Sequence, residues 1–501
     1  MPDRSPDERP ASIGADAAER DVSPTAAAER PMPDPTDLVA LGTMIGDADP
    51  AGRLHPIGMR TIRIGEDALA EVPVIVRALA RPGPVVVLVD STPMQRGPDD
   101  LKSLVVELLE AVGEVRLAVI GRGRAELHAD DAALAEADSA IEGAGCVVSV
   151  GSGTITDIAK DATHRAGDVP LVAIQTAVSV NAFSDDMAVL VRSGVKRTMP
   201  SRWPDALVID LAVIADAPQD MNRAGFGELA SMFTAPADWY LAGALGMDAD
   251  WHPEPVALFR REGEALLAAA DAVQTNDPGA LALLARLMTL SGIALGVAGK
   301  TAPISGTEHI VSHLLDMDAE QAGRSLAFHG AQVGVAAIVV ALAWTETLDT
   351  FEPATVDVDA AYPAAAIVEA EVRAAFAALD PSGAVANECW RDVEHKLTRW
   401  SDARPAFERF LADWPRHRAA LRRLVVDPAV LAGAVRRAGA PARFAELSPP
   451  VAPALARWAL LNCHRMRDRF VLPDLRASCS TWTPPDIDRL LDRAAALGAG
   501  L

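Results

Sequence analysis

Apolar runs rich in valine and isoleucine alternate with segments of helical spacing through the first part of the chain. Most of these runs are continuously apolar, which is typical of strands buried on both faces of a parallel sheet. Strands that alternate with helices predict an α/β fold with helices on both faces of that sheet. The five runs are MRTIRIG (59–65), PVVVLVD (84–90), VRLAVIG (115–121), CVVSVG (146–151) and PLVAIQT (170–176).

The β pattern changes and then fades along the rest of the chain. Residues 186–210 hold two β-runs around a Ser-Gly turn and a third run, which predict a hairpin followed by a strand. The later apolar segments have helical length and spacing. We therefore predict an N-terminal α/β nucleotide-binding domain at 37–217 and an all-α domain at 218–501. Residues 1–36 show no periodic apolar face and predict a disordered tail.

Charge and cysteine content exclude several classes of function. The formal net charge is −23, and a surface so acidic repels a phosphate backbone, so we predict no nucleic-acid partner. We find no apolar run of membrane-span length and predict no membrane contact. The four cysteines lie far apart without a CxxC pair, which is typical of reduced thiols in a cytoplasmic protein. Assembly into a homo-oligomer is left open.

A glycine turn connects the run at 146–151 to the following helical segment. Gly151, Ser152 and Gly153 form this turn. Glycines let a backbone approach a phosphate, and a helix N-terminus presents free N–H groups to it. The third glycine of the dinucleotide fingerprint is missing. Asp90, at the end of an earlier run, is the kind of carboxylate that binds a ribose, although it precedes the turn.

Two histidines, His309 and His313, lie four residues apart in SGTEHIVSHLLDM (305–317). Residues at this spacing share a helix face. The pair could bind a metal or an anion, or could be two half-buried structural histidines. Asp157 and Lys160 also share a helix face, and their simplest interpretation is a surface ion pair.

Four basic residues stand close together in RSGVKRTMPSR (192–202). They could help to neutralise a phosphate group. A solvated hairpin is the simpler interpretation of this cluster. The four residues are Arg192, Lys196, Arg197 and Arg202.

Five segments occur in an order that resembles the dehydroquinate synthase-like superfamily, which includes the iron-containing alcohol dehydrogenases. The branch most similar to them is that of the sn-glycerol-1-phosphate dehydrogenases. The resemblance covers roughly 55–345 and the far C-terminus, where CHRMRDRFVLPDL (463–475) is also similar. It implies the fold of that superfamily and hydride transfer between a nicotinamide and a metal-held alcohol. The segments are VGSGTITDIAK, IQTAVS, GFGELASMFTAPADWYLA, SGTEHIVSHLLDM and FHGAQVG.

The same resemblance implies a role for individual residues. One divalent metal (zinc, nickel or iron) would be held by Glu228, His309 and His329. His313 and Asn181 would be the catalytic residues beside a small phosphorylated substrate. NAD or NADP would contact the glycine turn and its surroundings, and Asp90 favours NAD because a carboxylate repels a 2′-phosphate. The implied cofactor-binding residues are Asp90, Gly151, Ser152, Gly153, Thr154, Asp157, Thr176, Ser179 and Ser184.

Three positions depart from the pattern of the glycerol-1-phosphate dehydrogenases. Glu228 and Asn181 each stand where that branch has Asp, and its lysine is replaced by Ser231 or Met232. The leading interpretation is a dehydrogenase of a small polyol phosphate, with sn-glycerol 1-phosphate and dihydroxyacetone phosphate as first candidates. The alternatives are a dehydroquinate synthase-like cyclase that uses NAD transiently and a degenerate homologue that only binds nucleotide.

Overall fold

The computed structural model describes residues 33–124, 126–192 and 195–501. Residues 34–501 form one compact unit. The predicted tail at 1–36 falls almost entirely outside the described residues, and so do the side chains of Arg192 and Lys196.

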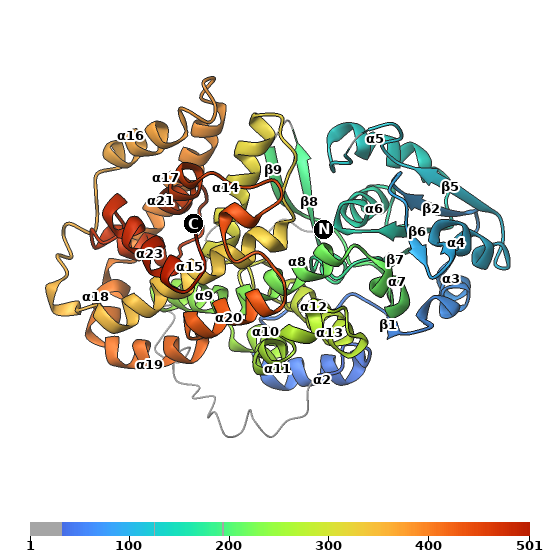
Figure 1. The fold of residues 1–501 in the computed structure, drawn as a ribbon, viewed down its shortest axis with the longest axis horizontal. Coiled ribbons are helices and arrows are strands. Elements are labelled where there is room, and N and C mark those ends of the chain that lie inside the picture. The colour runs from blue at the N-terminus through green and yellow to red at the C-terminus, as the bar shows by residue number, and fades with distance from the viewer. Residues whose placement is uncertain (1–32, 125, 193–194) are drawn as a thin grey trace, which may run out of the picture. The chain divides into compact units, whose positions relative to one another are not determined.

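A six-stranded sheet forms the centre of the α/β half (Figure 1). Its order is β1-β10-β7-β6-β2-β5, and every neighbouring pair is parallel. All five predicted runs form strands of this sheet, so the predicted α/β fold is confirmed. The strands are β1 (Thr61–Gly65), β2 (Val85–Val89), β5 (Val115–Val119), β6 (Cys146–Gly151), β7 (Leu171–Gln175) and β10 (Ala206–Asp210).

Helices cover both faces of the sheet because successive residues of a strand point in opposite directions. Val87 of β2 packs with α3 and α4 on one face, whereas Val86 packs with α5 and α6 on the other (Figure 1). A two-stranded ribbon, β3 (Gln95–Arg96) and β4 (Asp99–Asp100), lies outside the sheet. The helices of this half are α3 (Val72–Leu79), α4 (Leu101–Glu110), α5 (Asp131–Ala140), α6 (Gly153–Arg165) and α7 (Leu211–Asp216).

The predicted hairpin is also present, as β8 (Met187–Arg192) and β9 (Val195–Pro200) in antiparallel register. It packs over α6, where the backbone N–H of Val189 donates to Asp157 Oδ2 at 3.2 Å. The hairpin therefore buries Asp157 and Lys160, and the interpretation of this pair as a surface ion pair is wrong. Lys160 Nζ lies 3.4 Å from Asp157 and 2.6 Å from Asp185.

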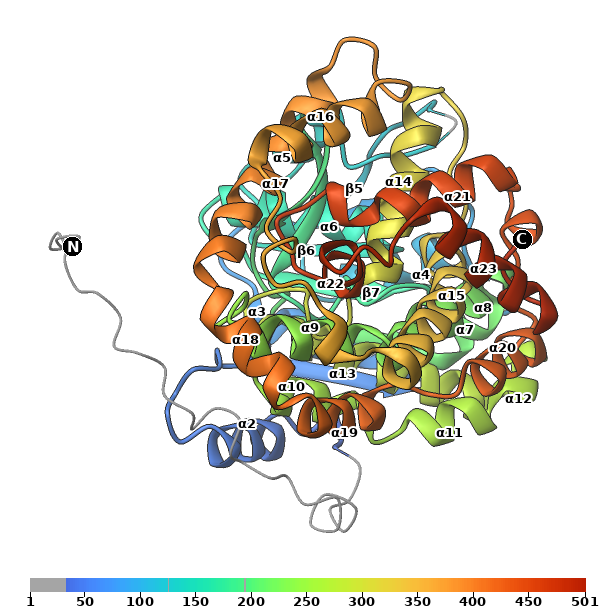
Figure 2. The same ribbon diagram turned by 90° about the vertical axis from the view of Figure 1, so that its left-hand side faces the viewer.

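Beyond β10 the described chain is helical, as predicted. The core of this half lies among α8, α13, α14 and α15, and the later helices pack around them (Figure 2). The helices are α8 (Gln219–Ala230), α9 (Ala235–Ala244), α10 (Pro253–Arg260), α11 (Gly263–Ala268), α12 (Ala270–Gln274), α13 (Pro278–Ala298), α14 (Thr307–Gln321), α15 (His329–Thr350), α16 (Ala365–Phe376), α17 (Ala384–Asp402), α18 (Arg404–Ala412), α19 (Trp414–Leu424), α20 (Pro428–Arg437), α21 (Pro453–Asn462), α22 (Leu472–Ser478) and α23 (Pro484–Ala496).

Two long apolar helices and one N-terminal helix belong to the core of this half. Helices α13 and α15 are long and apolar enough to cross a membrane, so the statement that no run reaches that length is wrong. Their apolar windows are 83% and 89% buried inside the protein, because both helices are surrounded by others in the core. Helix α2 (Leu38–Ala48) precedes the sheet in sequence, yet Leu41 and Ile45 pack in the same cluster as α13.

Candidate metal and cofactor site

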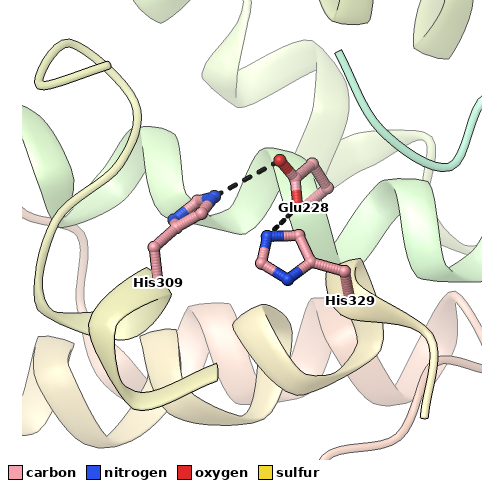
Figure 3. Close-up of side chains that lie close together, drawn as sticks. All are labelled: Glu228, His309 and His329. Atoms are coloured by element: carbon pink, nitrogen blue, oxygen red, sulfur yellow. Dashed lines mark hydrogen bonds and ion pairs between the residues drawn. The ribbon is translucent and has the colours of Figure 1, made fainter. Parts of the chain in front are cut away.

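Three helices bring the predicted metal ligands together (Figure 3). Glu228 lies near the end of α8, His309 in the first turn of α14, and His329 is the first residue of α15. Helices α8 and α15 approach closely because glycines face each other. A Cβ at Gly227 would lie 2.2 Å from the carbonyl oxygen of Gly330. The glycines of the GFGE and HGAQVG segments thus allow Glu228 and His329 to meet.

The side chains of Glu228, His309 and His329 point toward one another. His309 Nε2 lies 3.3 Å from Glu228 Oε1, and His329 Nε2 lies 3.9 Å from Glu228 Oε2. The three ligand atoms all lie within 4.8 Å of one another. Glu228 Oε2 is buried and accepts no hydrogen bond from the described residues. Two imidazoles and a carboxylate around such an atom fit a divalent metal that keeps a coordination position open.

The second nitrogen of each imidazole is occupied, which fixes the ring. His309 Nδ1 donates to the Glu308 carboxylate at 3.0 Å. Ser312 Oγ donates to Gln332 Oε1 at 2.7 Å, so this hydroxyl accepts the hydrogen bond from His329 Nδ1 at 2.9 Å. Both Nε2 atoms are thereby left as the ligands, an arrangement typical of metal-binding histidines.

Electrostatics bind the triad together. Burial alone would raise the pKa of Glu228, but His309 and His329 hold it below its usual range. Burial alone would lower the pKa of His309, but the Glu228 and Glu308 carboxylates outweigh this effect and raise it to about 9. Without a cation the site therefore holds a proton on His309, and a metal would take the place of that proton.

His313 lies one turn beyond His309 and faces the same space. Its ring centre is 5.3 Å from that of His329. His313, His329 and Asp316 form a second group whose ligand atoms lie within 4.8 Å of one another. Asp316 accepts a hydrogen bond from Gln332 Nε2 at 3.0 Å. The two groups share His329, and His313 thus stands next to the triad rather than in it.

A cavity of about 860 Å³ joins this cluster to the carboxyl ends of the parallel strands. The edge where parallel strands end is where such sheets bind ligands. The first residues of α6 line the cavity, and the helix N-terminus has no side-chain cap, which leaves its N–H groups for an anion. Of the predicted cofactor residues, those lining the cavity are Asp90, Ser152, Gly153, Thr154, Asp157, Thr176 and Ser179.

Other predicted residues have different surroundings. Gly151 and Ser184 are not in the cavity lining. A Cβ at Gly151 would lie 2.2 Å from Ile155, so this glycine lets α6 begin directly after β6. Ser184 Oγ donates to the Thr289 carbonyl oxygen of α13 at 3.0 Å. Asn181 lines the cavity, and Ser231 donates to the Glu228 carbonyl oxygen, away from the ligand atoms.

Sequence reasoning missed several residues around the site. Glu308 and Ser312 orient the two imidazoles. Both residues belong to the EHxxSH pattern, so the sequence contained a signal for them. Arg467 and Arg469 line the cavity from the segment after α21. Arg202, by contrast, is engaged with Asp205 at 2.6 Å. The basic side chains in the cavity thus come mainly from the segment after α21. In the sequence, only the similarity of this segment to the superfamily indicated that it has a function.

Comparisons with known proteins find similar sequences and similar folds. Residues 63–218 match the family model described as iron-containing alcohol dehydrogenase. The glycerol-1-phosphate dehydrogenase (NAD(P)+) of Bacillus licheniformis is 29% identical over 289 residues, which are 57% of this chain and 70% of that protein. The corresponding protein of Halalkalibacterium halodurans is 34% identical over 196 residues, 38% of this chain and 48% of that one. The chain thus matches between about half and 70% of the length of these two relatives.

Solved structures extend the likeness across the whole fold. A probable glycerol dehydrogenase from Sinorhizobium meliloti 1021 has a TM-score of 0.54 and 17% identity, and it covers 89% of this chain and 99% of its own. The resemblance inferred from the ordered segments is confirmed. Residues 63–218 thus match the model of the iron-containing alcohol dehydrogenase family, and the chain shares its fold with the Sinorhizobium meliloti structure.

Proposed function

We propose that the protein is a metal-dependent, NAD(P)-linked dehydrogenase that interconverts a small polyol phosphate and its ketone. The first candidate alcohol is sn-glycerol 1-phosphate, because the relatives are named glycerol-1-phosphate dehydrogenases. Dihydroxyacetone phosphate is the ketone that oxidation of its secondary alcohol gives. The observation that carries the proposal is the Glu228, His309 and His329 triad at one end of a cavity whose other wall is the uncapped start of α6.

The residues divide the reaction between them. A divalent ion on the triad would supply a Lewis acid that polarises the substrate oxygen. Ketone reduction adds a hydride to carbon and a proton to oxygen. We assign His313 to the substrate hydroxyl, where it passes this proton, and Asn181 to the orientation of the substrate. The start of α6 binds the cofactor pyrophosphate, and Asp90 binds the adenosine ribose.

The location and the cofactor are part of the same proposal. Asp90 lies 3.7 Å from Lys102 Nζ, which offsets part of the carboxylate charge, so we propose that NAD and NADP are both accepted. The four cysteines are free, and three are buried, which is consistent with a cytoplasmic protein. We propose no membrane or nucleic-acid partner.

The test is an oxidation screen with the metal-reconstituted full chain. NADH and NADPH are each incubated with dihydroxyacetone phosphate, unphosphorylated dihydroxyacetone and other phosphorylated ketones and aldehydes. We expect stoichiometric oxidation of the nucleotide with dihydroxyacetone phosphate. Conversion of a substrate with no net change in nucleotide would instead indicate cyclase chemistry. Full metal and nucleotide binding without turnover of any substrate would contradict the proposal.

A further inference from the structure

Two arginines of the segment after η6 (Cys463–Arg465) line the cavity from the helical half. The side chain of Arg469 is fixed in place. It donates to the backbone oxygen and hydroxyl of Ser305 and to the Thr301 hydroxyl. These contacts attach the segment to the loop that leads into α14. Arg469 therefore contributes a positive charge to the cavity, while its N–H groups donate to Ser305 and Thr301 of the protein itself.

Arg467 is different. No acceptor of the described residues lies within hydrogen-bond or ion-pair distance of its guanidinium. Burial and the nearby charge of Arg469 lower its pKa to about 10 against the opposing effect of Asp392 and Asp468, and the guanidinium is still protonated at neutral pH. Asp468, the next residue, is instead 3.7 Å from Arg399. Arg467 is half-buried, and the carboxylates of Asp392 and Asp468 attract it without reaching ion-pair distance. Its N–H donors therefore stay available for an anion that arrives with a ligand.

The position of Arg467 relative to the metal triad follows from α14. Arg467 also lines a smaller cavity together with Met317. His309, His313 and Met317 are spaced four residues apart, so they form one row on the same helix face. The row spans about 12 Å, because a helix rises about 1.5 Å per residue. A substrate whose oxygen lies at the triad would extend along this row in the direction of Arg467, whose side chain lines the same cavity.

Other basic side chains are less suited to the same task. Arg197 lies beside Arg467 in the smaller cavity but is ion-paired with Glu388. Arg124 lines the main cavity but is ion-paired with Asp130 at 3.0 Å. The start of α6 is on the opposite, α/β side and is assigned to the cofactor pyrophosphate.

We propose that Arg467, with Arg469 behind it, is the anion-binding residue that recognises the phosphate group of the substrate. The identity of the molecule that carries this phosphate rests on the proposed function. The presence of the anion site does not. A planar guanidinium offers paired donors to phosphate oxygens, and a neutral substrate of the same size would gain nothing from it.

The first experiment compares two substrates in the metal-loaded full chain. We expect Arg467→Met to lower the ratio of kcat/KM for dihydroxyacetone phosphate to that for dihydroxyacetone by about 10- to 100-fold. Arg467→Lys should restore part of the ratio because it restores the charge. Arg465→Met is the matched control, since Arg465 ends η6, two residues before Arg467, and pairs with Glu371. An unchanged ratio in Arg467→Met would overturn the proposal.

The second experiment does not depend on turnover. Inorganic phosphate is titrated by calorimetry into the metal-loaded protein with NADH saturating, so that the cofactor site is filled. We expect wild type to bind phosphate and Arg467→Met to bind it at least about tenfold more weakly. If wild type reduces no ketone but shows this dependence on Arg467, the proposed function fails and the anion site stands. Equal phosphate binding by both proteins overturns the anion site, even if dihydroxyacetone phosphate is a substrate.

Discussion

Two buried glutamates, Glu228 and Glu346, are each surrounded by cationic groups, yet their environments differ. Glu346 lies on α15 and accepts hydrogen bonds from Arg476, Arg489 and Arg493 at 2.8–3.0 Å, which use both carboxylate oxygens. Glu228 has one hydrogen bond at 3.3 Å, from His309, and its other oxygen has none from the described residues.

The difference separates a structural cluster from a binding site. In both places neighbouring positive charge outweighs burial and holds the glutamate pKa below its usual range. Arginine stays protonated, so the Glu346 cluster is complete as it stands. Histidine can release its proton and bind a metal ion with the same nitrogen. The charge of Glu228 is therefore balanced either by a proton on His309 or by a metal ion that replaces this proton.

The largest expected effect is on turnover. His309→Ala and His329→Ala should each lower kcat/KM by about 1,000-fold or more, because a Lewis acid contributes several kcal/mol to such a reaction. The control is His417→Ala, which removes a buried imidazole that contacts Tyr240 at 3.0 Å, outside the cavity. Steady-state rates for the three variants check this. A triad variant as active as the control would place the chemistry elsewhere.

The next effect is on stability, at the other glutamate. Glu346→Gln should lower the free energy of unfolding by about 2–3 kcal/mol, because charge-assisted hydrogen bonds are lost and Arg476 stays buried without its counter-ion. Urea unfolding of the metal-free protein measures the change. Metal content and turnover of the folded variant should equal those of wild type, and a loss of metal would show that the two clusters are coupled.

A smaller effect is expected from the residue behind His309. Glu308 accepts from His309 Nδ1, from Thr234 Oγ1 at 2.8 Å and from the Gly306 N–H at 2.6 Å. Glu308→Gln should weaken metal binding by about 10- to 100-fold, since the imidazole loses its charged partner. Competition with a chromophoric chelator gives the dissociation constant. Unchanged affinity would mean that Glu308 serves only the fold.

The contributions of the two clusters to folding stability depend on pH with opposite signs. The pKa of Glu346 is lowered by folding, so its contribution to stability is present above its unfolded value of about 4.5 and is lost as the pH falls below it. The pKa of His309 is raised to about 9, so in the metal-free protein its contribution is present below about 6.5 and is lost as the pH rises through 9.

Metal affinity should change with pH in the opposite direction to the stability contribution of His309. A protonated ring cannot bind a metal, so affinity should increase as the pH rises toward 9. Titrations at several pH values, in wild type and in Glu346→Gln, check both trends. The acid loss of stability should shrink in Glu346→Gln, while the pH dependence of metal affinity should stay. An affinity independent of pH would contradict the proton–metal exchange.

The sheet could be predicted because its central strands are buried on both faces and therefore appear in the sequence as unbroken apolar runs, such as 84–90 and 170–176. The triad could be named only through the ordered segments, since Glu228 and His309 are 81 residues apart. Contacts set by long-range packing could not be predicted. The burial of Lys160 depends on a hairpin that folds over α6, and the arginines around Glu346 come from 130 to 147 residues further along the chain.

Metal stoichiometry in Glu228→Gln and Glu346→Gln tests the central distinction most directly. Both variants replace one buried carboxylate with an isosteric amide on neighbouring helices. Elemental analysis after reconstitution and removal of free metal should find about one divalent ion per chain in wild type and in Glu346→Gln, and almost none in Glu228→Gln. Full occupancy in Glu228→Gln, or equal loss in both variants, would contradict the assignment of Glu228, His309 and His329 as the metal site.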